Sequence, residues 1–250
     1  LKAYIMLHQA EHFDPVALKA FIMADWEINL PRNVTNEQRK ALESHLDTLL
    51  SHGQLSSPVP VNTQLITKVR NIVASTPIAQ RIYHRLKQQG VGADLPEFTI
   101  AKYAGPAASL VFTRASNLPL TRGVPGLFSY DGYYQSFSQA TEEITGQLVR
   151  EETWVLDLPE KERSRFLDSH AAAEINDKVR RLYLHDYAQA WDTFISDIRL
   201  IHTNTLRESI QLARLLSATD SPLPPLLQAI VKEVTLINSN ETDRDIVEKA

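Results

Sequence analysis

The chain of 250 residues contains no cysteine, only two methionines and only eight glycines. The lack of cysteine excludes disulfides, thiolate catalysis and cysteine-ligated zinc. No apolar run approaches the 18 or more residues that a membrane-spanning helix needs. The net charge of −4 is small and negative, which disfavours nucleic acid as a partner. What remains is an ordinary globular composition, 43% apolar and 22% charged, that can bury a proper core.

The common motifs of catalysis are also missing: there is no G-x-S-x-G elbow, phosphate-binding loop or dinucleotide fingerprint. One pentapeptide, His8 to His12, matches the H-x-x-E-H pattern of zinc proteases, in which both histidines project from one helix. Asp14-Pro15 begins a new helix two residues later, so we expect the pentapeptide to straddle a helix end and a loop. The sequence therefore predicts no catalytic, metal or cofactor site. The alternative is a metal-assisted hydrolase that uses His8, Glu11 and His12.

Helix boundaries are easy to read in this chain. Thr35 and Gln38 form a capping box, and Gly53 and Gly90 suit helix ends. The longest periodic apolar segment has one interruption, at Asp186. The pattern predicts helices over residues 14–30, 35–52, 66–73, 76–89, 132–150, 159–170, 175–198, 206–216 and 222–237.

The segment Leu110–Tyr134 interrupts this helical pattern. Four of the eight glycines and three prolines lie in or beside it, and long non-helical segments are usually functional or organised corners of a fold. Residues 98–100 and 126–130 are compatible with short strands. The sequence therefore predicts a mainly α fold with a short irregular or β-hairpin insertion around residues 97–130. We expect an N-terminal helical subdomain (1–90), the irregular insertion (91–132), a C-terminal helical subdomain (133–237) and a polar linker (238–250).

Four aromatic residues crowd the end of this segment, and two arginines flank its centre. Such aromatics either anchor a loop in the core or present a contact surface, because they dominate the energetics of both. We expect most of them to be anchors and one or two to face a partner. The candidate protein-contact residues are Phe128, Tyr130, Tyr133, Tyr134, Arg114 and Arg122.

Five blocks of sequence carry a resemblance to a known family. They are residues 1–31 (LKAYIMLHQAEHFDPVALKAFIMADWEINLP), 76–87, 110–137, 179–200 and 213–233, in order along almost the whole chain. VPGLFSYDGYY (124–134) and RLYLHDYAQAWD (181–192) are the most specific of them. These blocks resemble the periplasmic part of the IcmF/TssM family, the large inner-membrane component of type VI secretion systems.

The resemblance implies a structural component of the TssJ–TssL–TssM membrane complex. Because Leu1 is not a start methionine, we expect a piece of a longer chain, in the periplasmic portion of an inner-membrane protein. In the family, membrane helices and an NTPase-like domain precede this region and a β-sandwich follows it. The implied partners are other copies of the protein, with the lipoprotein TssJ and the inner-membrane protein TssL through the full-length chain. No small-molecule substrate or nucleic acid is expected. A helical protein-binding scaffold unrelated to secretion stays open as a further alternative.

Overall fold

The computed structural model describes residues 1–31, 33–53, 57, 59–159 and 169–236. The chain forms two compact units, and one of the boundaries between them falls within helix α8. Unit 1 comprises Leu1–Pro77 and Val149–Phe166, and unit 2 comprises Ile78–Leu148 and Leu167–Ala250. The boundaries at residues 90 and 132 stay a prediction. The predicted polar linker lies outside the described residues, as does most of the helix predicted over 159–170.

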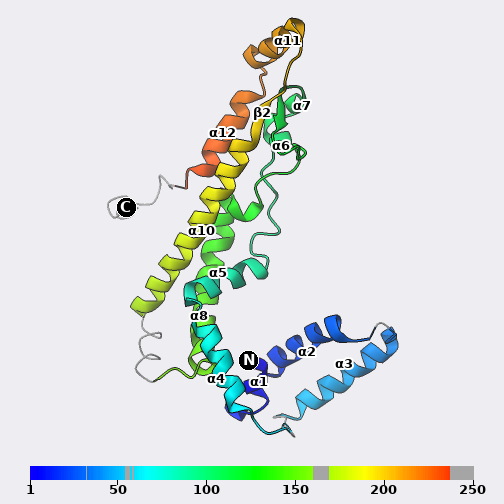
Figure 1. Cartoon of the computed structure of the whole chain (residues 1–250), viewed down its shortest axis with the longest axis vertical. Helices are drawn as coiled ribbons and strands as arrows, with labels where there is room; N and C mark the ends of the chain where they lie inside the picture. The colour runs from blue at the N-terminus through cyan, green and yellow to red at the C-terminus, as the bar shows by residue number, and fades with distance from the viewer. Residues whose placement is uncertain (32, 54–56, 58, 160–168, 237–250) are drawn as a thin grey trace. The chain divides into compact units, whose positions relative to one another are not determined.

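Unit 1 is built from helices (Figure 1). Leu18 of α2 packs with Leu46 and Leu50 of α3 to form its buried cluster, and Trp26 covers one side. The elements are α1 (Lys2–Met6), the 3-10 helix η1 (Ala10–His12), α2 (Pro15–Asn29), α3 (Asn36–Ser51), α4 (Thr63–Ala74) and the end of α8 (Ser138–Val155).

Local hydrogen bonds explain where these helices begin. The Asp14 carboxylate accepts from the backbone N–H groups of Val16 and Ala17, both at 3.0 Å, and Pro15 takes the first helical position. Thr35 and Gln38 exchange the two hydrogen bonds of a capping box. Both predicted helix starts are confirmed.

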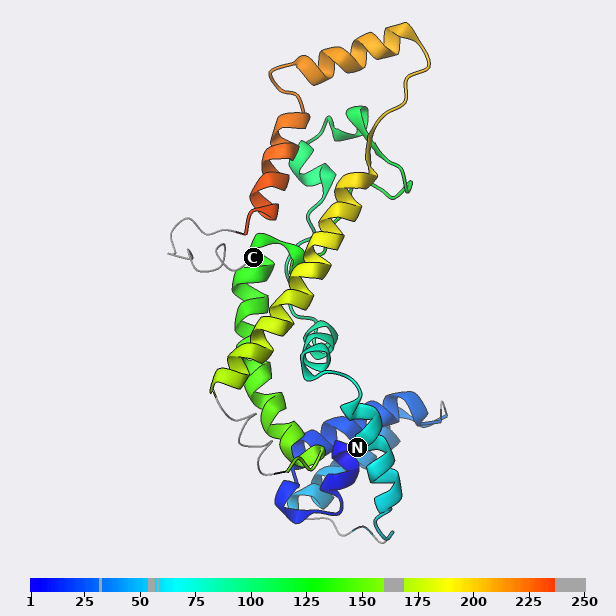
Figure 2. The same ribbon diagram turned by 60° about the vertical axis from the view of Figure 1, so that its left-hand side comes forward.

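Unit 2 is organised along the long helix α10 (Ser169–Asp197), as Figure 2 shows. Val179 and Tyr183 of this helix are fully buried. Ile82 and Leu86 of α5 are buried as well, and α5 packs on α10. The remaining elements are α5 (Ile78–Gln88), α6 (Ile100–Ala104), α7 (Ala108–Val111), β1 (Phe112–Arg114), the 3-10 helix η2 (Gly126–Phe128), the π-helix η3 (Gly132–Phe137), β2 (Ile198–Leu200), α11 (Leu206–Ser217) and α12 (Leu223–Val234).

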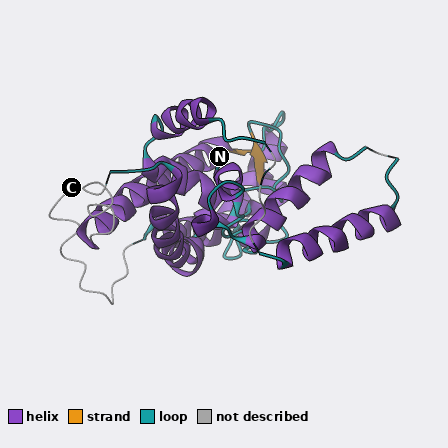
Figure 3. Cartoon of the chain, turned by 90° about the horizontal axis from the view of Figure 1, so that it is seen from below, coloured by secondary structure: helices purple, strands orange, loops and turns teal. Residues whose placement is uncertain are grey.

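Helices dominate the described residues, and β1 and β2 form one two-stranded antiparallel sheet, so the predicted mainly α fold class is confirmed (Figure 3). The strands pair Phe112 with Leu200 and Arg114 with Ile198, and thus join segments far apart in sequence. Residues 98–100 are the first of the two runs predicted to be compatible with strands, and there Phe98 makes a single bridge to Val124. Ile100 instead begins α6, because the Thr99 hydroxyl caps that helix by accepting from Lys102 N–H at 3.2 Å.

Residues 126–128 of the second run form η2 rather than a strand. Within the part of the chain that the structure describes, no helix is long and apolar enough to cross a membrane.

Candidate functional site: a loop anchored on helix α10

One face of α10 holds the loop that follows β1. We call residues 115–131 the anchored loop. Tyr183, Tyr187 and Trp191 recur every four residues and are buried, as one face of a helix requires. The Tyr183 hydroxyl donates to the Leu127 carbonyl at 2.6 Å, and the Trp191 indole N–H donates to the Phe128 carbonyl at 2.8 Å. Consecutive loop carbonyls thus find their hydrogen-bond donors on α10, as polar groups out of water require.

The tyrosines of this face stay protonated donors at neutral pH. Burial raises the pKa of Tyr183 and of Tyr187 above the ordinary value, because a phenolate would be poorly solvated there. Tyr187 donates its hydroxyl to the Glu233 carbonyl of α12 at 2.6 Å. The Glu233 carboxylate in turn accepts from Tyr130 N–H at 2.7 Å. Helix α12, α10 and the loop are therefore joined through one residue of α12.

The four aromatic candidates lie close together and half-buried. Phe128 lies near the rings of Tyr183 and Tyr187, with centroids 5.7 and 6.3 Å apart. Tyr134 lies between Tyr130 and Tyr133, at 4.7 and 4.8 Å, and donates its hydroxyl to the Leu236 carbonyl. The structure brings all four together at the end of the loop. Their role in contacting a partner stays a prediction.

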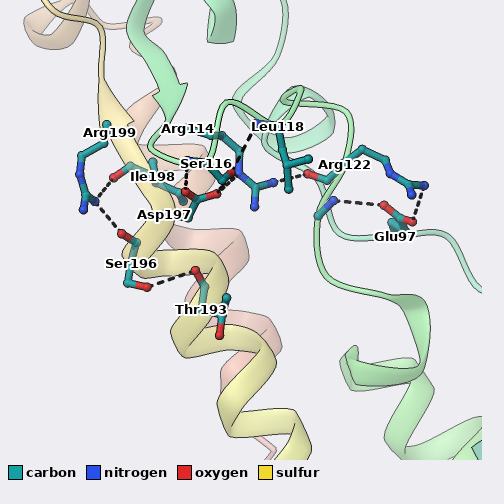
Figure 4. Close-up of polar contacts among 11 residues, drawn as sticks. Glu97, Arg114, Ser116, Leu118, Arg122, Thr193, Ser196, Asp197, Ile198 and Arg199 are labelled. Carbon is teal, nitrogen blue, oxygen red and sulfur yellow. Dashed lines mark hydrogen bonds and ion pairs between the residues drawn. The ribbon is translucent and has the colours of Figure 1, made fainter.

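A second anchor fixes the other end of the loop (Figure 4). The Arg114 guanidinium pairs with Asp197 at the end of α10, with Nε and Oδ2 2.5 Å apart and side chains only 7% and 13% exposed. Ser116 adds two donors to the same carboxylate, its N–H and its hydroxyl, each at 2.7 Å. Arg114 also donates to the Arg122 carbonyl and lies over the Phe194 ring. This candidate arginine is thus buried and partnered within the fold.

Arg122, the other candidate arginine, lies at the surface. Its side chain is 70% exposed and its guanidinium contacts Glu97 at 3.4 Å, a long ion pair (Figure 4). Glu97 also accepts from Gly123 N–H at 3.1 Å. An exposed pair of this kind contributes little to stability. The role of Arg122 in contacting a partner stays a prediction.

Glycine is required where the loop approaches other backbone. A Cβ atom on Gly123 would overlap the Phe98 carbonyl oxygen, and one on Gly132 would overlap the Gly126 carbonyl oxygen. These contacts explain why the glycines of the chain concentrate here. Gly132 also begins the π-helix η3, a rare turn that is frequent at functional positions.

Asp197 was not identified from the sequence, although one signal was present. An acidic residue at a helix C-terminus is unfavourable, because the last carbonyls carry partial negative charge. Hydrogen bonds from Ser116 and the Arg114 guanidinium nevertheless lower the pKa of Asp197 to about 2. A carboxylate in so unfavourable a place therefore predicts a cationic partner elsewhere in the chain.

Asp186, the one interruption of the apolar pattern of α10, also has a structural explanation. It accepts from the Tyr83 hydroxyl at 2.7 Å and from the Lys87 ammonium at 2.9 Å, both on α5. Burial alone would raise the pKa of Asp186, but these hydrogen bonds outweigh it and lower that pKa. Asp186 therefore fixes the register of α5 on α10.

The His8–His12 pentapeptide lies in unit 1, in the turn after α1 and in η1. His8 packs against the Tyr4 ring, with centroids 4.8 Å apart, whereas His12 stacks on Trp154 at 4.2 Å. Among the described residues, no group of three or more His, Cys, Asp or Glu side chains could hold a metal ion. The histidines therefore have different aromatic neighbours and no common ligand position.

The anchored loop thus has the chemistry of a built structural element: carbonyls and amides of the loop, and Arg114 just before it, bond to α10 and α12. Comparison with known proteins identifies the family of the chain. The chain matches the IcmF-related family (intracellular multiplication and human macrophage-killing) over residues 1–235. It is 38% identical, over 252 aligned residues, to the type VI secretion system component TssM1 of Pseudomonas aeruginosa. The alignment covers the whole of this chain and only 22% of the length of TssM1. No solved structure matches the chain. The chain belongs to the IcmF-related family.

Proposed function

We propose that this chain is a structural segment of a type VI secretion membrane complex, with a role in assembly rather than catalysis. The observation that carries the proposal is the match of the whole chain to TssM1, named as a component of that secretion system. The chemistry of the anchored loop supports it, since its polar groups bond to α10 and α12 and leave no nucleophile–base pair there. In this proposal the segment lies in the periplasm.

The assembly would involve other copies of the protein, and TssJ and TssL through the full-length chain. Interfaces of that kind need apolar, complementary surfaces with aromatic anchors. The loop region offers two candidates for such a contact: the half-buried Tyr133 and Tyr134 at one end, and the exposed Arg122 near the Arg114–Asp197 pair at the other.

Site-specific crosslinking tests this function, because the chain has no native cysteine. Leu118 and Thr121 are exposed loop positions suited to cysteine, whereas Asn117 has a positive φ of 60° that cysteine would adopt only with strain. In the full-length protein within cells, we expect Leu118→Cys and Thr121→Cys to crosslink to a neighbouring subunit. Exposed cysteines on α3, at Lys40 or Ser44, serve as matched controls.

Two results would contradict the proposal. One is normal secretion by cells whose full-length protein lacks the segment. The other is a hydrolase activity of the purified chain that is lost in a His8→Ala variant, which would favour the metal-assisted hydrolase. Loop cysteines that crosslink no more than the α3 controls would reject the loop as the contact surface.

A further inference from the structure

The distribution of charge in this chain is uneven. Residues 98–130 and 198–219 contain six lysines and arginines and one acidic residue, a net charge of +5. Two of the six, Arg114 and Arg122, pair with Asp197 and Glu97 just outside these segments, whereas Lys102, Arg199, Arg207 and Arg214 have no ion pair among the described residues. The whole chain has a net charge of −4, so the other residues carry −9. These two segments meet at the β1–β2 sheet and at the contact of α7 with α11, so the basic residues gather at one end of unit 2.

Helix α11 supplies the outer surface of this end, and both views place it beyond the C-terminal end of α10 (Figures 1 and 2). A capping box of Thr205 and Glu208 begins the helix, so it is a regular element rather than a frayed loop. It is strongly amphipathic, yet none of its residues is buried. Its half-buried leucines lie on the side where α7 packs: Leu212, Leu215 and Leu216.

The other side of α11 carries apolar side chains that project into solvent. Leu206 is 78% exposed and Ile210 is 45% exposed, and their spacing of four residues puts them on one stripe. Leu110 of the neighbouring α7 is 60% exposed. Exposed apolar residues grouped in this way indicate a binding surface rather than chance exposure.

Arginines border that stripe. Arg207 and Arg214, seven residues apart, lie on the same side of α11, next to the line of Leu206 and Ile210. Both are exposed, and neither guanidinium has an ion pair among the residues that the structure describes. Arg199 on β2 and Lys102 on α6 add two exposed positive charges. We call Leu110, Leu206, Ile210, Arg199, Arg207 and Arg214 the α11 end.

We propose that the α11 end binds the surface of an anionic phospholipid membrane. Projecting aliphatic side chains beside arginines are the features of helices that lie in the interface of a bilayer, with the apolar stripe among the acyl chains and the cations at the phosphates. The positive charges of Arg199, Arg207 and Arg214 are complementary to an anionic surface. The projecting side chains favour a deformable surface over a partner that needs a matching groove. Nothing in this inference depends on the proposed role in secretion.

Vesicle cosedimentation with the whole chain tests the proposal. We expect binding to vesicles of equal parts phosphatidylcholine and phosphatidylglycerol, weakening as salt rises, and little binding to phosphatidylcholine alone. The double variant Arg207→Gln, Arg214→Gln should bind about thirtyfold more weakly, because each arginine near an anionic leaflet contributes about a factor of five. Leu206→Ser should also weaken binding, while leaving the circular dichroism spectrum unchanged.

Matched controls separate the α11 end from general charge and hydrophobicity. The double variant Lys40→Gln, Arg181→Gln makes the same change in net charge elsewhere, and Ile28→Ser removes an equally exposed aliphatic side chain from α2. Both should bind as the unaltered chain does. Equal binding to both kinds of vesicle, no binding to either, or an equal loss in the controls would overturn the proposal. So would self-association without lipid that Arg207→Gln, Arg214→Gln abolishes, since the occupant would then be a second copy.

Discussion

Removing one hydroxyl tests whether α10 holds the anchored loop. Tyr183→Phe keeps the ring, which stacks on Phe137 at 3.9 Å, and deletes only the donor to the Leu127 carbonyl. Tyr183 is 0% exposed, so water has no direct access to replace the donor. A net hydrogen bond contributes about 1 kcal/mol, and a buried carbonyl left without a partner costs about 1–3 kcal/mol. We therefore expect the free energy of unfolding of unit 2 to fall by about 1–3 kcal/mol.

The measurement must report on unit 2 alone, because a chain of two units need not unfold in one step. Trp191 is the tryptophan of unit 2, and Trp26 and Trp154 belong to unit 1. Urea unfolding followed by fluorescence, with Trp26 and Trp154 replaced by Phe, therefore isolates the relevant transition. Tyr103→Phe is the matched control, since Tyr103 stacks on Phe98 and its hydroxyl has no hydrogen bond among the described residues. A loss for Tyr183→Phe no larger than the control's would refute the anchoring argument.

Two further predictions concern the same site. Gly132→Ala should destabilise unit 2 by about 3 kcal/mol or more in the same urea assay, because the added Cβ would overlap main-chain oxygens. Gly105→Ala is the comparison: Gly105 has a φ of 73° and open space around it, so this variant should cost about 1 kcal/mol. The pKa of Asp197 is lowered from 3.8 to about 2 in the fold. The ionised Asp197 carboxylate therefore stabilises the fold above about pH 4, and this stabilisation is lost as the pH falls towards 2. The stability of Asp197→Asn should therefore vary less with pH over that range; parallel pH profiles for variant and unaltered chain would contradict the assignment.

The parts of the fold set by local signals could be predicted from the sequence. Asp14-Pro15 and the Thr35–Gln38 pair determine helix starts through hydrogen bonds within three residues, so they can be read without knowing the rest of the structure. The strands could not be predicted in this way. Phe112–Arg114 becomes a strand only because Ile198–Leu200 arrives beside it, and neither segment has a distinctive pattern of its own.

The closeness of the aromatic residues in sequence is enough to predict the aromatic cluster of the candidate site. It does not predict which side chains of α10 hold the loop. The donors to the Leu127 and Phe128 carbonyls come from residues 56 and 63 positions away. The regular spacing of Tyr183, Tyr187 and Trp191 indicated a buried face of a helix. It could not indicate that two members of that face use their polar atoms to hold a loop, because the pattern contains no information on what packs against it.

Two acidic residues on α10 show how a long-range contact can be recognised in a sequence. Asp186 and Asp197 interrupt or end an otherwise apolar periodic helix, and a carboxylate in a poorly solvated place needs a cation. The sequence therefore predicts that each has a partner. It does not say which, because Lys87 and Arg114 lie 99 and 83 residues away among 26 lysines and arginines. Since the two aspartates are about three helical turns apart, they fix α5 and the anchored loop at separate positions along one helix. An interruption in an apolar pattern is thus evidence for a contact before the partner is known.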